Sequence, residues 1–228
     1  MFTIMVISFI VFIELTNKGV KKLYKDDKPK AYFNLLLAID CETSSINFGN
    51  KLNPAEGCQA VSWGIIVLNA NTLETIEELY LEVKWNGEAK WSKEAEDVHG
   101  LTKEYLEENG MSEEDALVEI ANLIQKHWGV KGSINTLGHN SISFDLPFLF
   151  DLYERYGLEL RYSYRNIDTN TLGFTLLRTY HSDDLFKSIG LPDRTVHNSL
   201  EDIRLTVESV RRIRILWDAK VGIKGTYG

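Results

Sequence analysis

Two carboxylates, Asp40 and Glu42, stand at the end of an apolar run that reads LLLAIDCET over residues 35–43. An unbroken apolar run is typical of a strand buried on both faces of a sheet. Side chains alternate along a strand, so both carboxylates point to the same side. Two neighbouring negative charges repel one another and are costly to desolvate. The pattern therefore predicts a divalent cation bound by oxygen ligands between them, and an acidic surface turn is the alternative.

Two further carboxylates stand where helices are expected to begin. Asp145 ends the segment GHNSISFD, which joins a strand to a helix, and a helix N-terminus favours a negative charge. Asp202 falls in the first turn of the last helix, and His197 lies in the loop before it. Taken alone, Asp145 is an ordinary N-cap, and Asn198 with Glu201 has the spacing of a capping box. A cap does not, however, require both His197 and Asp202.

Taken together, the four carboxylates and the histidine resemble the DEDDh subgroup of the DnaQ-like 3′→5′ exonuclease family. The resemblance rests on three motifs in order: Asp-x-Glu-Thr from Asp40, Asn-x-x-x-Phe-Asp ending at Asp145, and His-x-x-x-x-Asp from His197 to Asp202. It extends to the segments VHGLT and IDT and covers about residues 33–217. It implies an α/β chain with the RNase H-like fold of exonucleases, which is a five-stranded mixed sheet flanked by helices.

The sequence departs from the family pattern at three places. Three residues separate Asn140 from Phe144, where many members have two. Ser199 replaces a frequent alanine, and the loop over residues 44–57 is long. These departures affect the choice of subfamily more than the identity of the catalytic residues.

The resemblance implies a site for two divalent ions, Mg²⁺ or Mn²⁺, about 3.5–4 Å apart, which stabilise the charge that develops on the phosphate during hydrolysis. Asp40 would bridge both ions, and the other carboxylates would complete their coordination. His197 would take the proton from the attacking water, which suits a side chain that titrates near neutral pH. The implied catalytic residues are therefore Asp40, Glu42, Asp145, His197 and Asp202, and the four carboxylates among them are the implied metal ligands.

The resemblance also implies contacts to the terminal nucleotide through its backbone, its 3′-hydroxyl or its base. These contacts would come from Thr43, Ser44, His99, Asn140 and Phe144. For His99, a core or capping role is an equal alternative. The other histidines are interpreted as structural, namely His127, His139 and His181.

Basic side chains outside the motifs could line a track for nucleic-acid phosphates. The candidates are Lys126, Lys131, Arg194, Arg211, Arg212 and Arg214. Because Arg211, Arg212 and Arg214 circle the last helix, a solvated helix face is the favoured interpretation for them.

The function implied by the resemblance is metal-dependent hydrolysis of nucleic-acid 3′ ends to nucleoside 5′-monophosphates. A single-stranded or frayed DNA end is the favoured substrate, and trimming of RNA 3′ ends is the alternative. A proofreading subunit with a polymerase or replication partner fits such a chain, and so does a free nuclease. A non-catalytic module that binds a polymerase is a further alternative, although retention of all five site residues argues against it.

The overall composition is that of an ordinary globular protein, with 44 % apolar and 25 % charged residues in a chain of 228. This length suits one medium-sized domain. The net charge of −8 argues against a protein that coats nucleic acid through bulk positive charge. Cys41 and Cys58 lack a framework spacing, which favours a reducing compartment, so we expect a cytoplasmic protein, in the host cytoplasm if it is viral.

We expect three parts in the chain. Residues 1–30 form an apolar extension and a polar linker, residues 31–220 the exonuclease domain, and residues 221–228 a flexible tail. The apolar run of residues 1–13 is shorter than the ~20 residues of a membrane-spanning helix and lacks the features of a secretory signal. An added strand or a mis-assigned start is therefore favoured over an anchor, and no stable membrane association is expected.

Apolar periodicity and capping residues predict the elements that position the site. A short turn joins the second and third strands, so part of the sheet is expected to be antiparallel. Expected strands span residues 35–43, 59–68, 75–84, 133–138 and 164–167. Expected helices span residues 92–98, 103–108, 112–127, 145–156, 169–179 and 184–189, with a last one from residue 198 or 199. The apolar face of the last helix is predicted at Leu200, Ile203, Val207, Val210, Ile213 and Trp217.

Overall fold

The computed structural model describes residues 34–48, 50, 52–130, 132–194 and 197–221. The expected N-terminal extension and C-terminal tail therefore lie outside the described residues, as does the apolar run of residues 1–13. Within the described part, no helix combines the length and apolarity that crossing a membrane requires.

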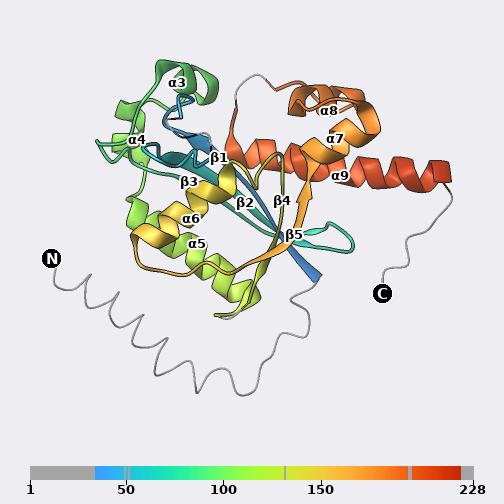
Figure 1. The fold of residues 1–228 in the computed structure, drawn as a ribbon, viewed down its shortest axis with the longest axis horizontal. Helices are drawn as coiled ribbons and strands as arrows, with labels where there is room; N and C mark the ends of the chain where they lie inside the picture. Colours follow the sequence, from blue (N-terminus) through green and yellow to red (C-terminus); the bar gives the residue numbers. More distant parts are fainter. Residues whose placement is uncertain (1–33, 49, 51, 131, 195–196, 222–228) are drawn as a thin grey trace. The chain divides into compact units, whose positions relative to one another are not determined.

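A mixed sheet of five strands forms the centre of the described part, as predicted (Figure 1). Its strand order is β3-β2-β1-β4-β5, so β1 is the middle strand. β1 pairs antiparallel with β2, and β2 with β3, whereas β1 pairs parallel with β4, and β4 with β5. The strands are β1 (Leu35–Thr43), β2 (Ala60–Asn69), β3 (Thr75–Glu82), β4 (Ile134–Gly138) and β5 (Tyr162–Asp168).

Helices connect and cover the strands, and several begin at the predicted capping residues. The side chains of Ser92, Thr102 and Ser112 each accept a hydrogen bond from the backbone of the first helical turn that follows. The helices are α3 (Lys93–His99), α4 (Lys103–Asn109), α5 (Glu113–Trp128), α6 (Asp145–Arg155), α7 (Thr169–Leu177), α8 (Ser182–Ser188) and α9 (Ser199–Val221).

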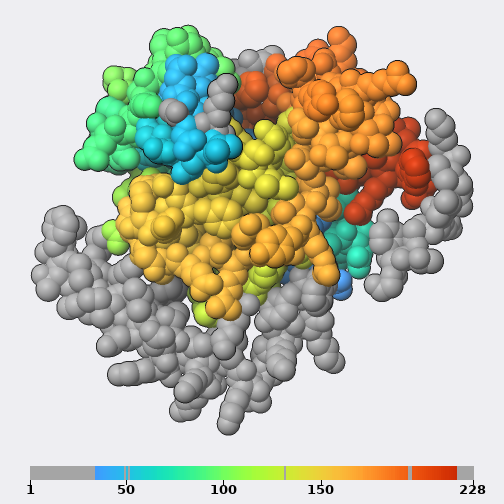
Figure 2. Space-filling model, viewed as in Figure 1, coloured from blue at the N-terminus to red at the C-terminus, as the bar shows by residue number. Residues whose placement is uncertain are grey.

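The two faces of the sheet are covered by different helices. Leu36 and Ala38 of β1 pack in one apolar cluster with Ile203 and Val207 of α9, so α9 lies on that face. The alternate residues of β1 are also fully buried, and α5 and α6 pack on β3 and β1 from the other side (Figure 1). In the space-filling view, α3 and α4 lie on one side of α6, and α7 and α8 lie on the other (Figure 2).

The predicted apolar face of α9 is correct over its first half and wrong at its end. Ile203, Val207 and Val210 are buried against the sheet. Trp217 is 51 % exposed, because α9 continues beyond the strands that it covers (Figure 1). Periodicity continued past the point where the sheet ends, so the sequence pattern alone could not locate that point.

The arginines in the second half of α9 are not a solvated face, contrary to expectation. Arg211 Nε donates to the carbonyl of Leu73 at 3.1 Å, and Arg212 Nη1 donates to that of Gly190 at 2.7 Å. Arg214 Nη1 donates in the same way to Asn71 at 2.9 Å. These side chains hold loops of the sheet and of α8 against the helix, because loop carbonyls without strand partners accept charged donors readily.

The start of α9 rests directly on β2, and Gly64 makes this possible. A Cβ atom at Gly64 would lie 2.2 Å from the carbonyl carbon of Ser199. Beside it, the Ser62 and Ser199 hydroxyls are 3.0 Å apart and hydrogen-bonded. Ser62 and Gly64 pair across the sheet with Glu42 and Asp40, respectively. The first turn of α9 is therefore fixed next to the end of β1.

We expect Gly64→Ala to destabilise the protein by about 1–3 kcal/mol, because the new methyl group meets rigid backbone. For a chain of this size, each kcal/mol lowers the Tm by about 2–4 °C in a thermal melt. A suitable control is Gly87→Asn, since Gly87 has a positive φ that asparagine tolerates, and a Cβ atom there would meet nothing within 4 Å. Equal Tm values for both variants would contradict the close approach of α9 to β2.

Candidate active site

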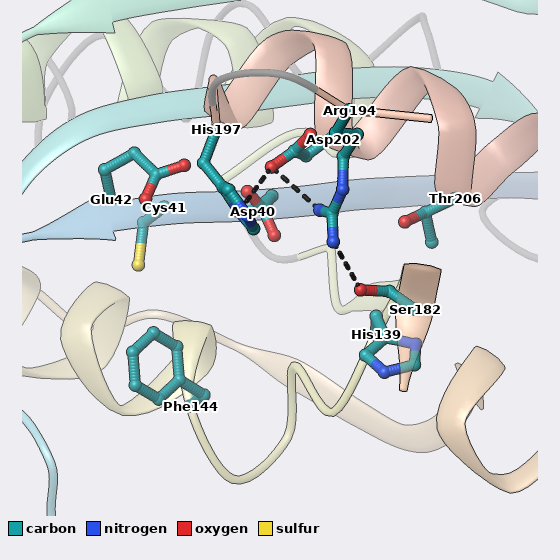
Figure 3. A pocket seen from close by; sticks show the side chains of 10 residues that line it. All are labelled: Asp40, Cys41, Glu42, His139, Phe144, Ser182, Arg194, His197, Asp202 and Thr206. Carbon is teal, nitrogen blue, oxygen red and sulfur yellow. Dashed lines mark hydrogen bonds and ion pairs between the residues drawn. The ribbon is translucent and has the colours of Figure 1, made fainter. Parts of the chain in front are cut away.

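A cavity of about 200 Å³ opens where the end of β1 meets the starts of α8 and α9. Its walls are mostly polar and charged, and three segments far apart in the sequence supply them (Figure 3). The residues that line it are Asp40, Cys41, Glu42, His139, Phe144, Ser182, Arg194, His197, Asp202 and Thr206. Four of the five predicted catalytic residues therefore meet at one cavity.

Asp40 and Glu42 project from β1 on the same face, as the alternation of a strand predicts. Burial, followed by the nearby charges of Asp145 and Glu42, raises the pKa of Asp40 well above its usual value. Burial and the charge of Asp202 raise the pKa of Glu42 to about 7. Both carboxylates therefore resist ionisation until a positive charge compensates them.

Asp145, the fifth predicted catalytic residue, is the first residue of α6 and lies directly behind this pair. Its Oδ1 accepts a hydrogen bond of 2.9 Å from the backbone N–H of Cys41, which stands between Asp40 and Glu42. The side chain is buried, and burial raises the pKa of Asp145 to about 7. Asp145 is therefore attached to the end of β1, although it does not line the cavity.

Asp202 and His197 approach the pair from α9. His197 Nδ1 lies 3.2 Å from Asp202 Oδ2, and this hydrogen bond raises the pKa of His197 (Figure 3). Asn198 Oδ1 accepts from the backbone N–H of Glu201 at 3.1 Å, which is the N-cap half of the expected capping box. The Glu201 carboxylate instead pairs with Arg204. The cap thus explains Asn198 but neither His197 nor Asp202.

The site has the properties that a divalent cation requires. Glu42, His197 and Asp202 each offer a ligand atom, and these atoms lie within 4.8 Å of one another. Asp202 Oδ1 is buried and has no hydrogen-bond partner among the described residues, which is costly unless something else binds it. Carboxylate oxygens are the ligands that Mg²⁺ and Mn²⁺ prefer. The residues present therefore fit a bound divalent metal.

Of the five residues predicted to contact a nucleotide, one lines the cavity. Phe144 lines the cavity, and its ring meets that of Phe48 edge-on with centroids 5.3 Å apart. Ser44 is buried and accepts a hydrogen bond from the backbone of Gln59, so its hydroxyl holds the loop after β1. Thr43, His99 and Asn140 also do not line the cavity. Their role in binding a nucleotide stays a prediction.

Several cavity residues carry no motif signal in the sequence. Arg194, Ser182 and Thr206 line the cavity beside the predicted residues, and Arg194 pairs with Asp202. His139, interpreted as structural, also lines it. Its Nδ1 and Nε2 are bonded to the Thr169 hydroxyl and the Tyr180 carbonyl at 2.9 and 3.0 Å. The structural interpretation of His139 fits these contacts.

Comparison with known proteins extends these observations. The model of the family RNase_T, described as an exonuclease, matches residues 37–210. No curated protein sequence matches the chain. Among solved structures, E. coli exonuclease I in complex with single-stranded DNA is similar with a TM-score of 0.67 and 15 % identity. This similarity covers 80 % of the present chain but only 41 % of exonuclease I.

For two further solved structures, the similarity covers a larger share of the other chain. The nuclease domain of 3′hExo, a DEDDh family member bound to rAMP, has a TM-score of 0.62 and 17 % identity over 82 % of this chain and 94 % of that domain. A 3′-exonuclease that recognises the histone mRNA stem-loop has a TM-score of 0.61 and 16 % identity, with 92 % and 73 % covered. At these identities the likeness shows the fold, which is the predicted RNase H-like fold of exonucleases.

The raised carboxylate pKa values predict how stability depends on pH and metal. A carboxyl with a raised pKa in the folded state stabilises the fold while it is protonated, and this contribution is lost as the pH rises through that pKa. For Glu42 the loss spans pH 4.5 to about 7. A cation binds the ionised form, so Mn²⁺ should raise the Tm more at about pH 7.5 than at about pH 5.5.

Thermal melts with EDTA or Mn²⁺ at both pH values test this expectation. Glu42→Gln should reduce the pH-dependent metal effect, because it removes one of the carboxyls whose pKa is raised. Glu104→Gln should preserve it, because Glu104 is exposed on α4. A metal-induced Tm shift of the same size at both pH values would contradict the pKa assignment.

Proposed function

This chain belongs to the RNase_T exonuclease family, and we propose that it is a metal-dependent 3′→5′ exonuclease that releases nucleoside 5′-monophosphates. One observation carries the proposal. Carboxylates from β1, α6 and α9 converge with His197 at the end of the central strand. This set of groups can hold cations, orient a phosphodiester and move one proton, which is what hydrolysis of that bond requires.

We assign the metal site to Asp40, Glu42, Asp145 and Asp202, with two Mg²⁺ or Mn²⁺ ions. Bound divalent ions supply Lewis-acid stabilisation of the charge that develops on the phosphate. The chain prepares this site by bringing its carboxylates together before any cation arrives. Their repulsion and burial make the site electrostatically unfavourable when empty, so a cation has a large favourable interaction to gain.

His197 is the general base in this proposal. Its side chain lines the cavity and is 38 % exposed, so a water molecule and the end of a nucleic-acid strand have access to it. When Nδ1–H donates to Asp202, the other ring nitrogen, Nε2, keeps a free lone pair. That nitrogen can take the proton from the attacking water, and Asp202 stabilises the imidazolium that results.

The substrate in this proposal is the 3′ end of a single strand, with DNA favoured. The likeness to exonuclease I in complex with single-stranded DNA supports this choice. The likeness to a 3′-exonuclease of the histone mRNA stem-loop, which covers more of this chain, makes RNA the second candidate. Phe144 lines the cavity and has an aromatic face that can stack on a base of either nucleic acid.

The compartment in this proposal is inferred from the cysteines. Cys41 and Cys58 are both buried free thiols, which supports a reducing, cytoplasmic compartment. The partner in this proposal is a polymerase or another replication protein. The non-catalytic alternative predicts no hydrolysis under any condition below.

The decisive experiment uses 5′-labelled DNA and RNA oligonucleotides of the same sequence with Mg²⁺ or Mn²⁺. We expect a ladder that shortens from the 3′ end, nucleoside 5′-monophosphate as product, and no digestion of a strand that ends in a 3′-phosphate. Asp40→Asn should abolish the activity, because Asp40 stands at the centre of the carboxylate group. Cleavage of a circular strand, or activity of Asp40→Asn equal to wild type, would refute the proposal.

His197→Ala separates proton transfer from metal binding. Loss of a general base lowers turnover by about 10²–10⁴-fold. The low-pH limb of the rate profile should flatten in the variant, because His197 must be deprotonated to act. Affinity for Mn²⁺, measured by titration calorimetry, should fall much less than in Asp40→Asn, since the four carboxylates remain and Asp202 keeps its ion pair with Arg194. A variant that binds Mn²⁺ as poorly as Asp40→Asn would show that His197 is a ligand instead.

A further inference from the structure

Arg194 brings a positive charge into the group of site carboxylates. It lies in the segment between α8 and α9 and lines the cavity, and its side chain is only 10 % exposed. A buried guanidinium is stable where carboxylates face it, because an unpaired buried charge is costly. Arg194 belongs to none of the three motifs in the sequence, so its role has to be inferred from its contacts.

The guanidinium of Arg194 connects Asp202 to the start of α8. Its Nη1 lies 3.0 Å from Asp202 Oδ2. On its other side, Nε donates to Asp183 Oδ1 at 2.7 Å. Nη2 donates to Ser182 Oγ at 2.7 Å (Figure 3). The guanidinium is planar and rigid, so anchoring at Asp183 and Ser182 also fixes the direction from which Nη1 meets Asp202.

The two oxygens of Asp202 are held differently as a result. Oδ2 contacts both Arg194 Nη1 and His197 Nδ1. Oδ1 is buried and has no hydrogen-bond partner among the residues that the structure describes. A carboxylate held by one oxygen does not rotate freely, so the orientation of the whole group is fixed. Such outer partners commonly set the affinity of a carboxylate for its metal.

We propose that Arg194, anchored by Asp183 and Ser182, is a positioning residue that orients Asp202 for cation binding. This inference rests on the metal site proposed above and adds α8 to the elements that the site needs. It also replaces the role of Arg194 in a phosphate track, because Nε, Nη1 and Nη2 already contact the protein.

Orientation and charge have opposite effects on cation affinity, and two variants separate them. The guanidinium repels an incoming cation, so its charge alone weakens binding. Asp183→Asn keeps that charge but weakens the anchor, and the Asp183 side chain is 65 % exposed, so the variant should fold. Arg194→Gln removes charge and orientation together. Asp184→Asn is the matched control, because Asp184 is the next residue of α8 and bonds to Thr179 instead.

Calorimetric titration of the full chain with Mn²⁺ gives the first measurement. We expect Asp183→Asn to weaken Mn²⁺ binding by about 10–100-fold, the usual effect of losing an outer partner of a metal ligand. Arg194→Gln should weaken it less, because removing the repulsive charge partly offsets the lost orientation. Asp184→Asn should bind as the wild type does. The double variant should lose no more than Arg194→Gln alone, because Asp183 acts through Arg194. Arg194→Lys should not rescue binding, since one ammonium does not reproduce the planar fork of the guanidinium.

Nuclease rates at varied Mg²⁺ give the second measurement. The Mg²⁺ concentration for half-maximal activity should rise in Asp183→Asn, and kcat should return towards the wild-type value at saturating Mg²⁺. A general loss of structure would instead lower kcat and the Tm together. Unchanged or tighter Mn²⁺ binding in Asp183→Asn would overturn the positioning role alone. No Mn²⁺ binding by the wild-type protein would refute the metal site itself and the inference with it.

Discussion

Repulsion among buried carboxylates is the constraint on which this structure depends. Asp40, Glu42, Asp145 and Asp202 are gathered at one end of the central strand, and burial with mutual repulsion raises the pKa of the first three. Such an arrangement opposes folding, so the rest of the molecule must hold it in place. The apolar packing of α9 on β1 and β2 and the central position of β1 supply that support.

The support is concentrated where α9 meets the sheet. Gly64 lets the first turn of the helix reach β2, and the hydrogen bond between Ser62 and Ser199 fixes its register. Arginines in the second half of α9 bind loop carbonyls, so the helix is held at both ends. A small shift of α9 would move Asp202 relative to β1, because Asp202 lies in its first turn. The geometry of the site therefore depends on the precise placement of α9.

The sequence located the candidate catalytic carboxylates because each lies at the start or end of a regular element. Asp40 and Glu42 follow an apolar run, and Asp145 and Asp202 lie in first helical turns, so periodicity and capping placed them on elements. The resemblance of the three motifs to the exonuclease family then distinguished them from ordinary caps. Arg194 could not be identified in this way. It lies in a loop, and its importance arises from the packing of α8 beside α9, which leaves no periodic signal. Similarly, Ser44 adjoins a motif, but only the folded loop shows that its hydroxyl is occupied by Gln59.

The residues that meet at the site are far apart in the sequence, and this determines when the site can form during synthesis. Cys41 and Asp145, joined at the site, are 104 residues apart, and Ser62 and Ser199 are 137 apart. Contacts between such distant residues form late, because closing a long loop carries an entropic cost that local contacts do not. A nascent chain that has left the ribosome only as far as α8 has the whole sheet but lacks Asp202 and His197. On the proposed assignment of these two residues, the site is therefore complete only after α9 has docked on the sheet.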